Sequence, residues 1–155
     1  MALITSPLDI TGCRLWLDAN QGLLDQFGNP ITTDGTSIGT WQDQSGNGNH
    51  VSSSSGTRPT YRTNVRTSYE RYSKVVRFGG NGLLAAGDVL ELGTNHALLF
   101  AVIKNTTAPT FNAQHIMSKS RPGSVGQYFL CRTSSADQTI SNGLLGFVRS
   151  NGLSL

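Results

Sequence analysis

Short apolar runs alternate with turn-forming residues along almost the whole chain. Clusters such as Gly28-Asn29-Pro30, Gly46-Asn47-Gly48 and Pro122-Gly123 separate the runs. Short strands divided by Gly, Pro and Asn clusters are typical of an all-β sandwich or barrel. The pattern predicts strands at Cys13–Leu17, Thr40–Gln42, Val75–Phe78, Asp88–Leu92, Ala97–Lys104, His115–Lys119, Tyr128–Arg132 and Leu144–Arg149.

Two segments carry further expectations about the elements. Leu98–Ile103 is the most hydrophobic run, which predicts a central strand buried on both faces. Pro59–Phe78 contains no glycine, and four of its apolar or aromatic residues recur near helical spacing, which predicts one or two helical turns there. The four residues are Val65, Tyr69, Tyr72 and Val76.

Two tryptophan-centred segments in the first third of the chain have the strongest local character. Trp41–His50 is a polar stretch rich in residues that tolerate positive φ, opened by a large aromatic, as in a tight turn. Leu15–Ala19 alternates apolar and polar residues around Trp16, as a half-buried strand does.

The turn admits two chemical interpretations. Asp43, Ser45 and Asn47 place oxygen-bearing side chains at alternate positions before a glycine, which resembles the front half of a calcium loop. Ser54 stands where such a loop needs a bidentate glutamate, although a distant carboxylate such as Asp18 could complete a site. The structural alternative, which we favour, is an Asx-type turn in which Asp43 caps backbone N–H groups. We therefore expect no cofactor, with calcium as the minor alternative.

Five sequence blocks follow one another in an order that resembles a known domain family. The blocks are Leu15–Ala19, Trp41–Gly48, Pro59–Tyr61, Val75–Gly80 and Leu98–Lys104. Over residues 13–104 the chain is therefore similar to LamG-like, concanavalin A-like lectin-glucanase domains of bacteriophage virion and bacterial surface proteins. The resemblance implies a jelly-roll β-sandwich used mainly for binding, and we expect one such domain over residues 1–155.

The chain departs from this family pattern in three places. The stretch between Tyr61 and Val75 is longer and more basic than the family leads us to expect, and Gly79 stands where such domains often carry Asp. Beyond residue 104 the blocks fade, and related jelly rolls usually run longer. We therefore expect the sandwich to be cut short near Leu155 or completed by a neighbouring chain, because an open edge strand invites pairing.

Composition adds a charge asymmetry to this picture. Only 14% of the 155 residues are charged, and the net charge is +3. Six cations gather within twenty residues, with Glu70 as the opposing acid and three tyrosines among them. Such a patch suits an anionic partner, but no nucleic-acid motif accompanies it, so a solvated loop or a protein interface is the favoured alternative and nucleic acid is not expected. The cations are Arg58, Arg62, Arg66, Arg71, Lys74 and Arg77.

Loops carry function on sandwich scaffolds, so this stretch also supplies the candidate contact residues for a glycan or a protein partner. Trp16 and Trp41 lie in strand-like contexts, where burial in the core is the commoner fate of tryptophan. The candidate contacts are Tyr61, Tyr69, Tyr72, Arg62 and Arg66.

Catalytic chemistry has little support in the sequence. Glycoside hydrolysis needs two carboxylates about 5–10 Å apart, whereas the acids here are scattered singly among loops. Asp88 and Glu91 are closest, yet three positions along a strand place them on opposite faces. The histidines form no metal-type pair. We therefore expect no enzymatic activity and no catalytic residues.

These observations lead to two functional hypotheses. The first is a non-enzymatic structural or attachment protein of a bacteriophage virion, whose partners are other copies of itself, other virion proteins and host-surface glycan. The alternative is a free carbohydrate-binding module of a bacterial surface or secreted protein, in one form calcium-dependent. The first residues, Met1–Pro7, lack the basic and apolar regions of a signal peptide, and no apolar run is long enough to insert into a membrane.

Overall fold

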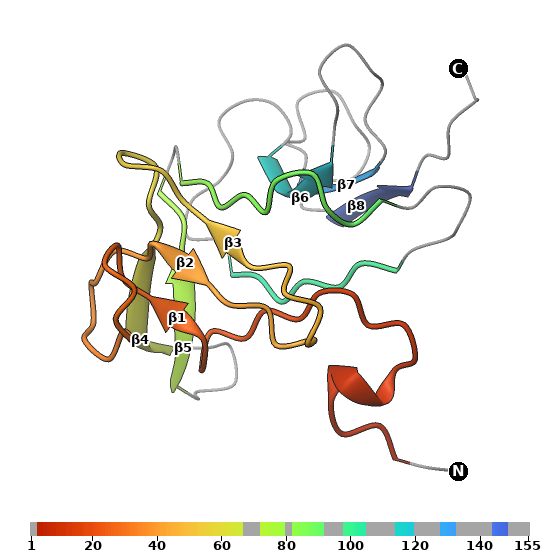
Figure 1. The fold of residues 1–155 in the computed structure, drawn as a ribbon, viewed down its shortest axis with the longest axis horizontal. Coiled ribbons are helices and arrows are strands. Elements are labelled where there is room, and N and C mark those ends of the chain that lie inside the picture. Colours follow the sequence, from red (N-terminus) through yellow and green to blue (C-terminus); the bar gives the residue numbers. More distant parts are fainter. Residues whose placement is uncertain are drawn as a thin grey trace. The chain divides into compact units, whose positions relative to one another are not determined.

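A computed structural model describes residues 3–66, 72–79, 82–91, 98–104, 114–119, 128–132 and 144–148. The chain divides into two compact units, residues 1–90 and residues 91–155, and each is described by itself (Figure 1). Unit 1 begins with a short 3-10 helix, η1 (Pro7–Asp9). The Ser6 side chain accepts from Leu8 N, and the Asp9 carboxylate accepts from Ser6 N, which forms a capping box.

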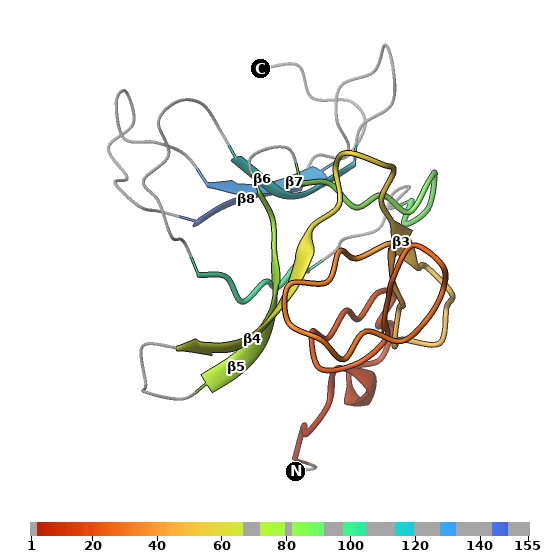
Figure 2. The ribbon, with the colours of Figure 1, turned by 90° about the vertical axis from the view of Figure 1, so that its left-hand side faces the viewer.

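The strands of unit 1 form two antiparallel sheets. β1 (Leu23–Leu24), β2 (Thr40–Trp41) and β3 (Val51–Ser52) form a three-stranded sheet in that order. β4 (Thr60–Arg66) and β5 (Tyr72–Arg77) form a long hairpin, which Figure 2 shows as a curved two-stranded ribbon.

Unit 2 contains one antiparallel sheet in sequence order, made of β6 (Gln114–Lys119), β7 (Tyr128–Arg132) and β8 (Leu144–Val148). Within the described ranges every strand pair is antiparallel and η1 is the one helical element. The all-β prediction is therefore confirmed, whereas the jelly-roll arrangement stays a prediction.

Some of the observed strands match the predictions from the sequence, and others do not. Five predicted strands correspond to β2, β5, β6, β7 and β8. The pattern missed β1, β3 and β4. The predicted strand at Cys13–Leu17 is wrong, because these residues form no ladder and are held by loop side chains instead. Residues 88–91 of the predicted strand Asp88–Leu92 also form no ladder.

The helical turns expected in Pro59–Phe78 are strands in the structure. β4 and β5 account for residues 60–66 and 72–77, and the connecting residues 67–71 lie outside the described ranges. Thr, Val and Tyr fill both segments, and such β-branched and aromatic residues fit a pleated surface better than a helix. Cross-strand pairing over five registered positions therefore outweighs the near-helical spacing.

The expected central strand at Ala97–Lys104 is also wrong in its described part. Residues 98–104 form no strand, and Leu98, Phe100 and Val102 are exposed. An apolar run favours burial, but it becomes a strand only where backbone partners lie beside it. Hydropathy alone carries no information about those partners.

The core of unit 1 is small and lies between the sheet and the hairpin. Leu23, Ile38 and Tyr61 are buried together, with Trp41 and Val76 packed against them. The 3-residue core draws on β1, the loop before β2, and β4. Ile38 is fully buried, and its N–H donates to the Pro59 carbonyl at 2.8 Å, which ties that loop to the start of the hairpin.

Gly39 allows two backbone segments to approach closely beside this core. A Cβ atom at this position would lie 2.8 Å from the carbonyl carbon of Asp25 and 2.8 Å from Gln26 Cα. Real Cβ atoms do not come this near to backbone atoms, so any larger residue must push the segments apart. Gly39 N also donates to Leu24 O at 2.9 Å, which fixes the approach.

We predict that Gly39→Ala lowers the free energy of unfolding by about 2 kcal/mol or more, because the added methyl overlaps backbone that cannot relax cheaply. Gly79→Ala is the matched control, since nothing lies within 4 Å of its Cβ position and its φ is not positive. Chemical denaturation of both variants measures the difference. Equal stabilities would contradict the close approach.

Candidate functional site

The Asp43 carboxylate organises the polar turn that follows β2. Its Oδ1 accepts from Trp16 N at 2.9 Å and from Ser45 N at 2.8 Å. Its Oδ2 accepts from the Ser45 hydroxyl at 2.7 Å and from Asn49 N at 3.0 Å. Asp43 is 7% exposed, so these bonds are shielded from water. The carboxylate therefore closes its own turn and also binds the Trp16 segment, 27 residues earlier.

The same turn holds that earlier segment through further side chains. Asn47 Nδ2 donates to Cys13 O at 2.9 Å, and Asn49 Nδ2 donates to Arg14 O at 2.8 Å. The Trp41 indole N–H donates to Asp18 O at 3.0 Å. The two tryptophan-centred segments of the sequence are thus brought together by side-chain hydrogen bonds.

These contacts favour the structural interpretation of Asp43, Ser45 and Asn47. Four N–H or O–H donors occupy both oxygens of the Asp43 carboxylate, and a cation would have to displace them. Ser45 Oγ donates to that carboxylate, and Asn47 turns its amide nitrogen toward backbone carbonyls. Within the described ranges, no three His, Cys, Asp or Glu side chains gather closely enough to hold a metal ion.

The environment of Asp43 also sets its protonation. Burial raises the pKa of Asp43 and is the largest single influence, but the hydrogen bonds from Trp16 N, Ser45 and Asn49 N together outweigh it. The pKa of Asp43 therefore lies below its ordinary value, so the charged carboxylate is the form that the turn stabilises.

The aspartates in residues 3–66 all accept hydrogen bonds from backbone N–H groups. Asp9 accepts from Thr5 N and Ser6 N, and Asp25 accepts from Phe27 N and Asn29 N. Asp18 accepts from Asn20 N, and Asp34 accepts from Thr63 N at 2.6 Å. Each carboxylate closes a turn or a bulge, which is a structural role.

The β4–β5 hairpin carries exposed cationic and aromatic side chains. Its register pairs Tyr61 with Val76, Arg62 with Val75, and Arg66 with Tyr72. A β-bulge between Arg62 and Val65 shifts the register, which sets two residues of β4 against one of β5. Directly opposed residues of an antiparallel pair share a face, and successive residues alternate. The register therefore assigns each side chain to a face.

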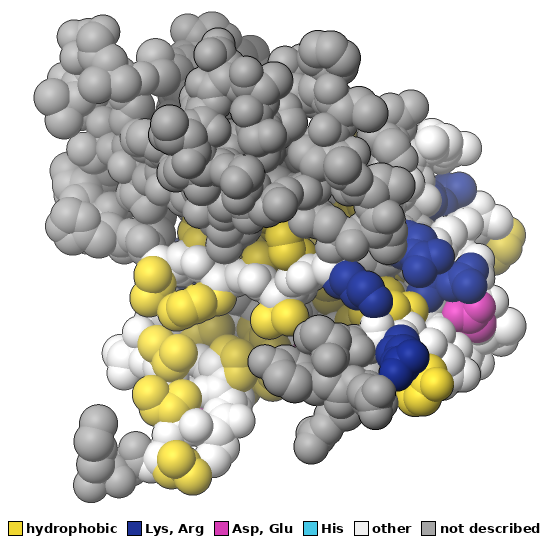
Figure 3. Space-filling view, turned by 180° about the vertical axis from the view of Figure 1, so that it is seen from behind, with side chains coloured by type: hydrophobic (Ala, Val, Ile, Leu, Met, Phe, Trp, Pro, Cys, Tyr) yellow, Lys and Arg dark blue, Asp and Glu magenta, His cyan; other side chains and the backbone are white. Residues whose placement is uncertain are grey.

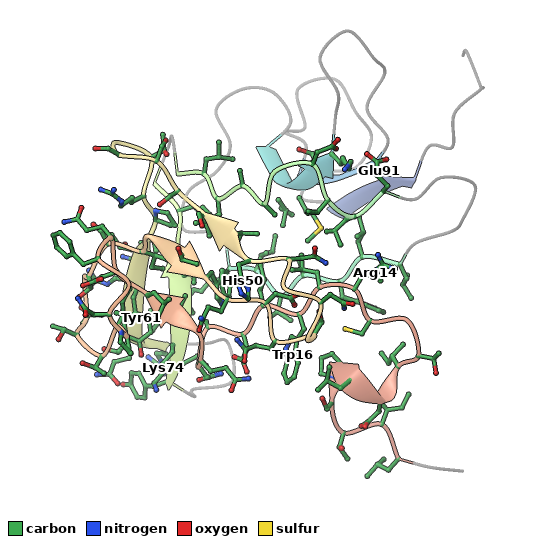
Figure 4. The ribbon with its side chains drawn as sticks, in the orientation of Figure 1. Arg14, Trp16, His50, Tyr61, Lys74 and Glu91 are labelled. Carbon is green, nitrogen blue, oxygen red and sulfur yellow. The ribbon has the colours of Figure 1, made fainter. Side chains whose placement is uncertain are left out.

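One face of the hairpin is buried in the core at one end and exposed to solvent at the other. Tyr61 and Val76 lie on this face in the core. Toward the turn the same face carries Arg66, Tyr72 and Lys74, all of them exposed, with Tyr72 at 69%. Figure 4 labels Tyr61 and Lys74 among the side chains of this hairpin. The hairpin thus extends past the core and presents two cations and an aromatic ring to solvent.

The other face of the hairpin carries Arg62 and Arg77, and Arg58 lies just before it. Arg62 forms an ion pair with Asp34 at 3.3 Å, with side chains 38% and 42% exposed, so the pair is partly screened by water. The Nε atoms of Arg58 and Arg62 are buried and have no hydrogen-bond partner. Figure 3 shows several Lys and Arg side chains near one another in one view of the molecule.

The structure separates the sequence-predicted contact residues. Arg66 and Tyr72 are brought together on an exposed face, and Arg62 lies on the opposite face. The prediction that Tyr61 contacts a partner is wrong, because its side chain is 4% exposed and belongs to the core, where it cannot contact a glycan. Tyr69 lies outside the described residues.

Sequence reasoning missed Asn64, and the structure places it in the bulge beside this face. Its φ of 54° is in the left-handed region, and its side chain is exposed. Asparagine tolerates a positive φ better than most residues do, and this tolerance is the one property of the sequence that could have indicated the bulge.

No protein-family model, curated protein or solved structure matches the chain. The LamG-like resemblance therefore stays a prediction. None of the helices that the structure describes has the length and apolar character needed to cross a membrane.

Replacing Asp43 with alanine should be far more damaging than replacing Asp18. Asp43→Ala leaves the buried donors of Trp16, Ser45 and Asn49 without an acceptor, so we expect a loss of about 3 kcal/mol. Asp18→Ala removes a local cap to Asn20 only, so we expect a loss of about 1 kcal/mol. Denaturant unfolding of both variants tests the difference, and equal losses would contradict the role of Asp43 in joining the two segments.

Stability should fall in acid. A carboxylate whose pKa is lowered by folding stabilises the native state above its unfolded pKa, about 3.9, and this contribution is lost as pH falls through the folded value. Asp9 and Asp25 shift in the same direction through bonds from Thr5 N and Asn29 N, respectively. In the Asp43→Asn variant, the free energy of unfolding should therefore fall less steeply as the pH drops below about 4. An unchanged slope would contradict the lowered pKa of Asp43.

Calcium should leave the thermal midpoint of the chain unchanged, since donors already occupy the Asp43 carboxylate. Differential scanning calorimetry with calcium and with EDTA tests this expectation. A higher midpoint in calcium that disappears in Asp43→Asn would restore the calcium interpretation of the turn.

Proposed function

We propose that this chain is a non-enzymatic structural or attachment protein of a bacteriophage virion, built on a lectin-like jelly-roll sandwich. The observation that carries the proposal is the β4–β5 hairpin, which presents Arg66, Tyr72 and Lys74 beyond a core held by capped turns. Cations and an aromatic ring on a protruding element suit contact with another surface.

The use of the acidic side chains supports a binding role over a catalytic one. The aspartates at positions 9, 18, 25, 34 and 43 accept backbone N–H groups. A carboxylate committed to a cap is poorly placed to exchange protons with a substrate, because the exchange would break the turn that it closes.

The exposed Tyr72 ring favours a second candidate function, a free carbohydrate-binding module of a bacterial surface or secreted protein. An exposed aromatic face offers apolar contact area to a sugar ring at low entropic cost. The contacts of Asp43 favour a form of this module that does not depend on calcium.

Solution mass separates the two candidates. Light scattering on the purified 155-residue chain should show a defined oligomer or larger assembly that is indifferent to EDTA, because a virion component assembles with copies of itself or with other virion proteins. A stable monomer that binds a sugar would instead favour the free module. A stable monomer that binds no glycan would contradict both.

A further inference from the structure

The Asn47 side chain is a hydrogen-bond donor that joins the polar turn to the earlier tryptophan segment. Its Nδ2 donates to Cys13 O at 2.9 Å and to Ser45 Oγ at 2.8 Å, and less closely to Arg14 O at 3.4 Å. The single hydroxyl hydrogen of Ser45 is donated to Asp43 Oδ2 at 2.7 Å. An amide nitrogen carries two hydrogens, so both are used here. The atoms bonded to Asn47 Nδ2 therefore all act as acceptors.

The residue that follows Asn47 makes this side chain chemically reactive. Gly48 has no Cβ atom, so its backbone nitrogen can approach the side-chain carbonyl of the preceding asparagine without hindrance. Asn49 Nδ2 makes a similar bond, to Arg14 O at 2.8 Å, but His50 follows it and carries a bulky side chain. The turn thus contains two asparagines with similar contacts and different reactivity.

The reaction open to the Asn47–Gly48 pair is deamidation, which needs water alone. Gly48 N attacks Asn47 Cγ and forms a new N–C bond that closes a succinimide ring. The Cγ–Nδ2 bond breaks, and the amide nitrogen takes up the proton lost by Gly48 N and leaves as ammonia. Water then opens the ring at either carbonyl, which gives aspartate or isoaspartate. No atom is oxidised or reduced, and position 47 gains a carboxyl group that is charged at neutral pH.

The closed turn protects Asn47 from this reaction. Ring closure requires the side chain to rotate until Cγ meets Gly48 N, and the bonds to Cys13 O and Ser45 Oγ restrict that rotation. The reaction therefore waits for the turn to open. Opening that breaks several hydrogen bonds at once is rare in the native state. The rate of deamidation should thus follow how often the turn opens.

A carboxylate at position 47 cannot remake the bonds of the amide. It has no hydrogen to donate, whereas the carbonyl oxygens of Cys13 and Arg14 are acceptors only. The Ser45 hydroxyl would then lie between this carboxylate and that of Asp43, and its one hydrogen can serve only one of them. Two like charges at this separation repel each other. Deamidation therefore disfavours the closed turn.

We propose that Asn47–Gly48 is a modification site, whose deamidation irreversibly releases the Cys13–Trp16 segment from the turn. Folding suppresses the reaction, each opening of the turn exposes Asn47 to it, and the product keeps the turn from closing again. The pair is thus a one-way switch that records opening of the first unit. This inference does not depend on the proposed attachment function, because it concerns the turn and not the hairpin.

Peptide mapping by mass spectrometry tests the protection. The full 155-residue chain is incubated at mildly alkaline pH in native buffer and in guanidinium. We expect Asn47 to deamidate at least about tenfold more slowly in native buffer, because opening of the turn limits the reaction. Asn49 is the matched control, and it should react much more slowly than Asn47 in guanidinium. Equal rates for Asn47 in the two conditions would refute protection by the turn, and equal rates for the two asparagines in guanidinium would refute the role of Gly48.

Hydrogen exchange in two full-length variants tests the release. Asn47→Ala removes the donors alone, whereas Asn47→Asp also adds the charge of the product. We expect exchange at Trp16 N, which donates to Asp43, to be about tenfold faster in Asn47→Asp than in Asn47→Ala. Exchange at Ile38 N, which donates to Pro59 O in the core, should be alike in both. Added salt should narrow the difference at Trp16.

The aged wild-type chain provides a test that does not require the aspartate variant to fold. After incubation in native buffer, molecules deamidated at Asn47 should exchange faster at Trp16 N than unmodified molecules of the same sample. The Asn47→Ala chain, aged in the same way, controls for the other Asn–Gly pairs at positions 81, 142 and 151 and should show no such change at Trp16. Undiminished protection at Trp16 in the deamidated molecules, or equal exchange there in Asn47→Asp and Asn47→Ala, would overturn the proposal.

Discussion

The Asp43 carboxylate is the interaction on which the first unit depends. Four donors converge on it, and three of them belong to the turn that it closes, two at Ser45 and one at Asn49. The fourth, Trp16 N, comes from a segment that has no ladder of its own. Because the carboxylate is buried, losing it would leave several N–H groups without water or protein partners, which is costly. One side chain therefore replaces a strand pairing that the alternating sequence of Leu15–Ala19 had led us to expect.

The other aspartates of the first unit also hold backbone N–H groups. The chain carries few charges, and its first five aspartates are committed to backbone N–H groups. Asp34 is an example, since it holds the bulge by accepting from Thr63 N and pairs its second oxygen with Arg62. One carboxylate can thus serve a backbone N–H group and a cation at the same time.

The hairpin also shows how a buried core and an exposed face share two strands. Tyr61 and Val76 fix one end of the ribbon in the core, and the register carries the same face outward to Tyr72 and Lys74. Rigid strands hold side chains more accurately than a loop does. The bulge then sets Asn64 beside the exposed residues, so the irregularity serves the surface while the regular part serves stability.

The sequence by itself determined the all-β class, because turn residues punctuate short runs of β-branched and aromatic residues, and local chemistry of this kind needs no distant partner. It also indicated that Asp43 caps its own turn. Only the tertiary structure decided that Tyr61 is core and Tyr72 is surface, since the two tyrosines differ in position along the hairpin and not in local sequence character. It likewise decided that residues 98–104 form no strand despite their hydropathy. Burial and pairing depend on which segments meet, and that information is spread over the whole chain.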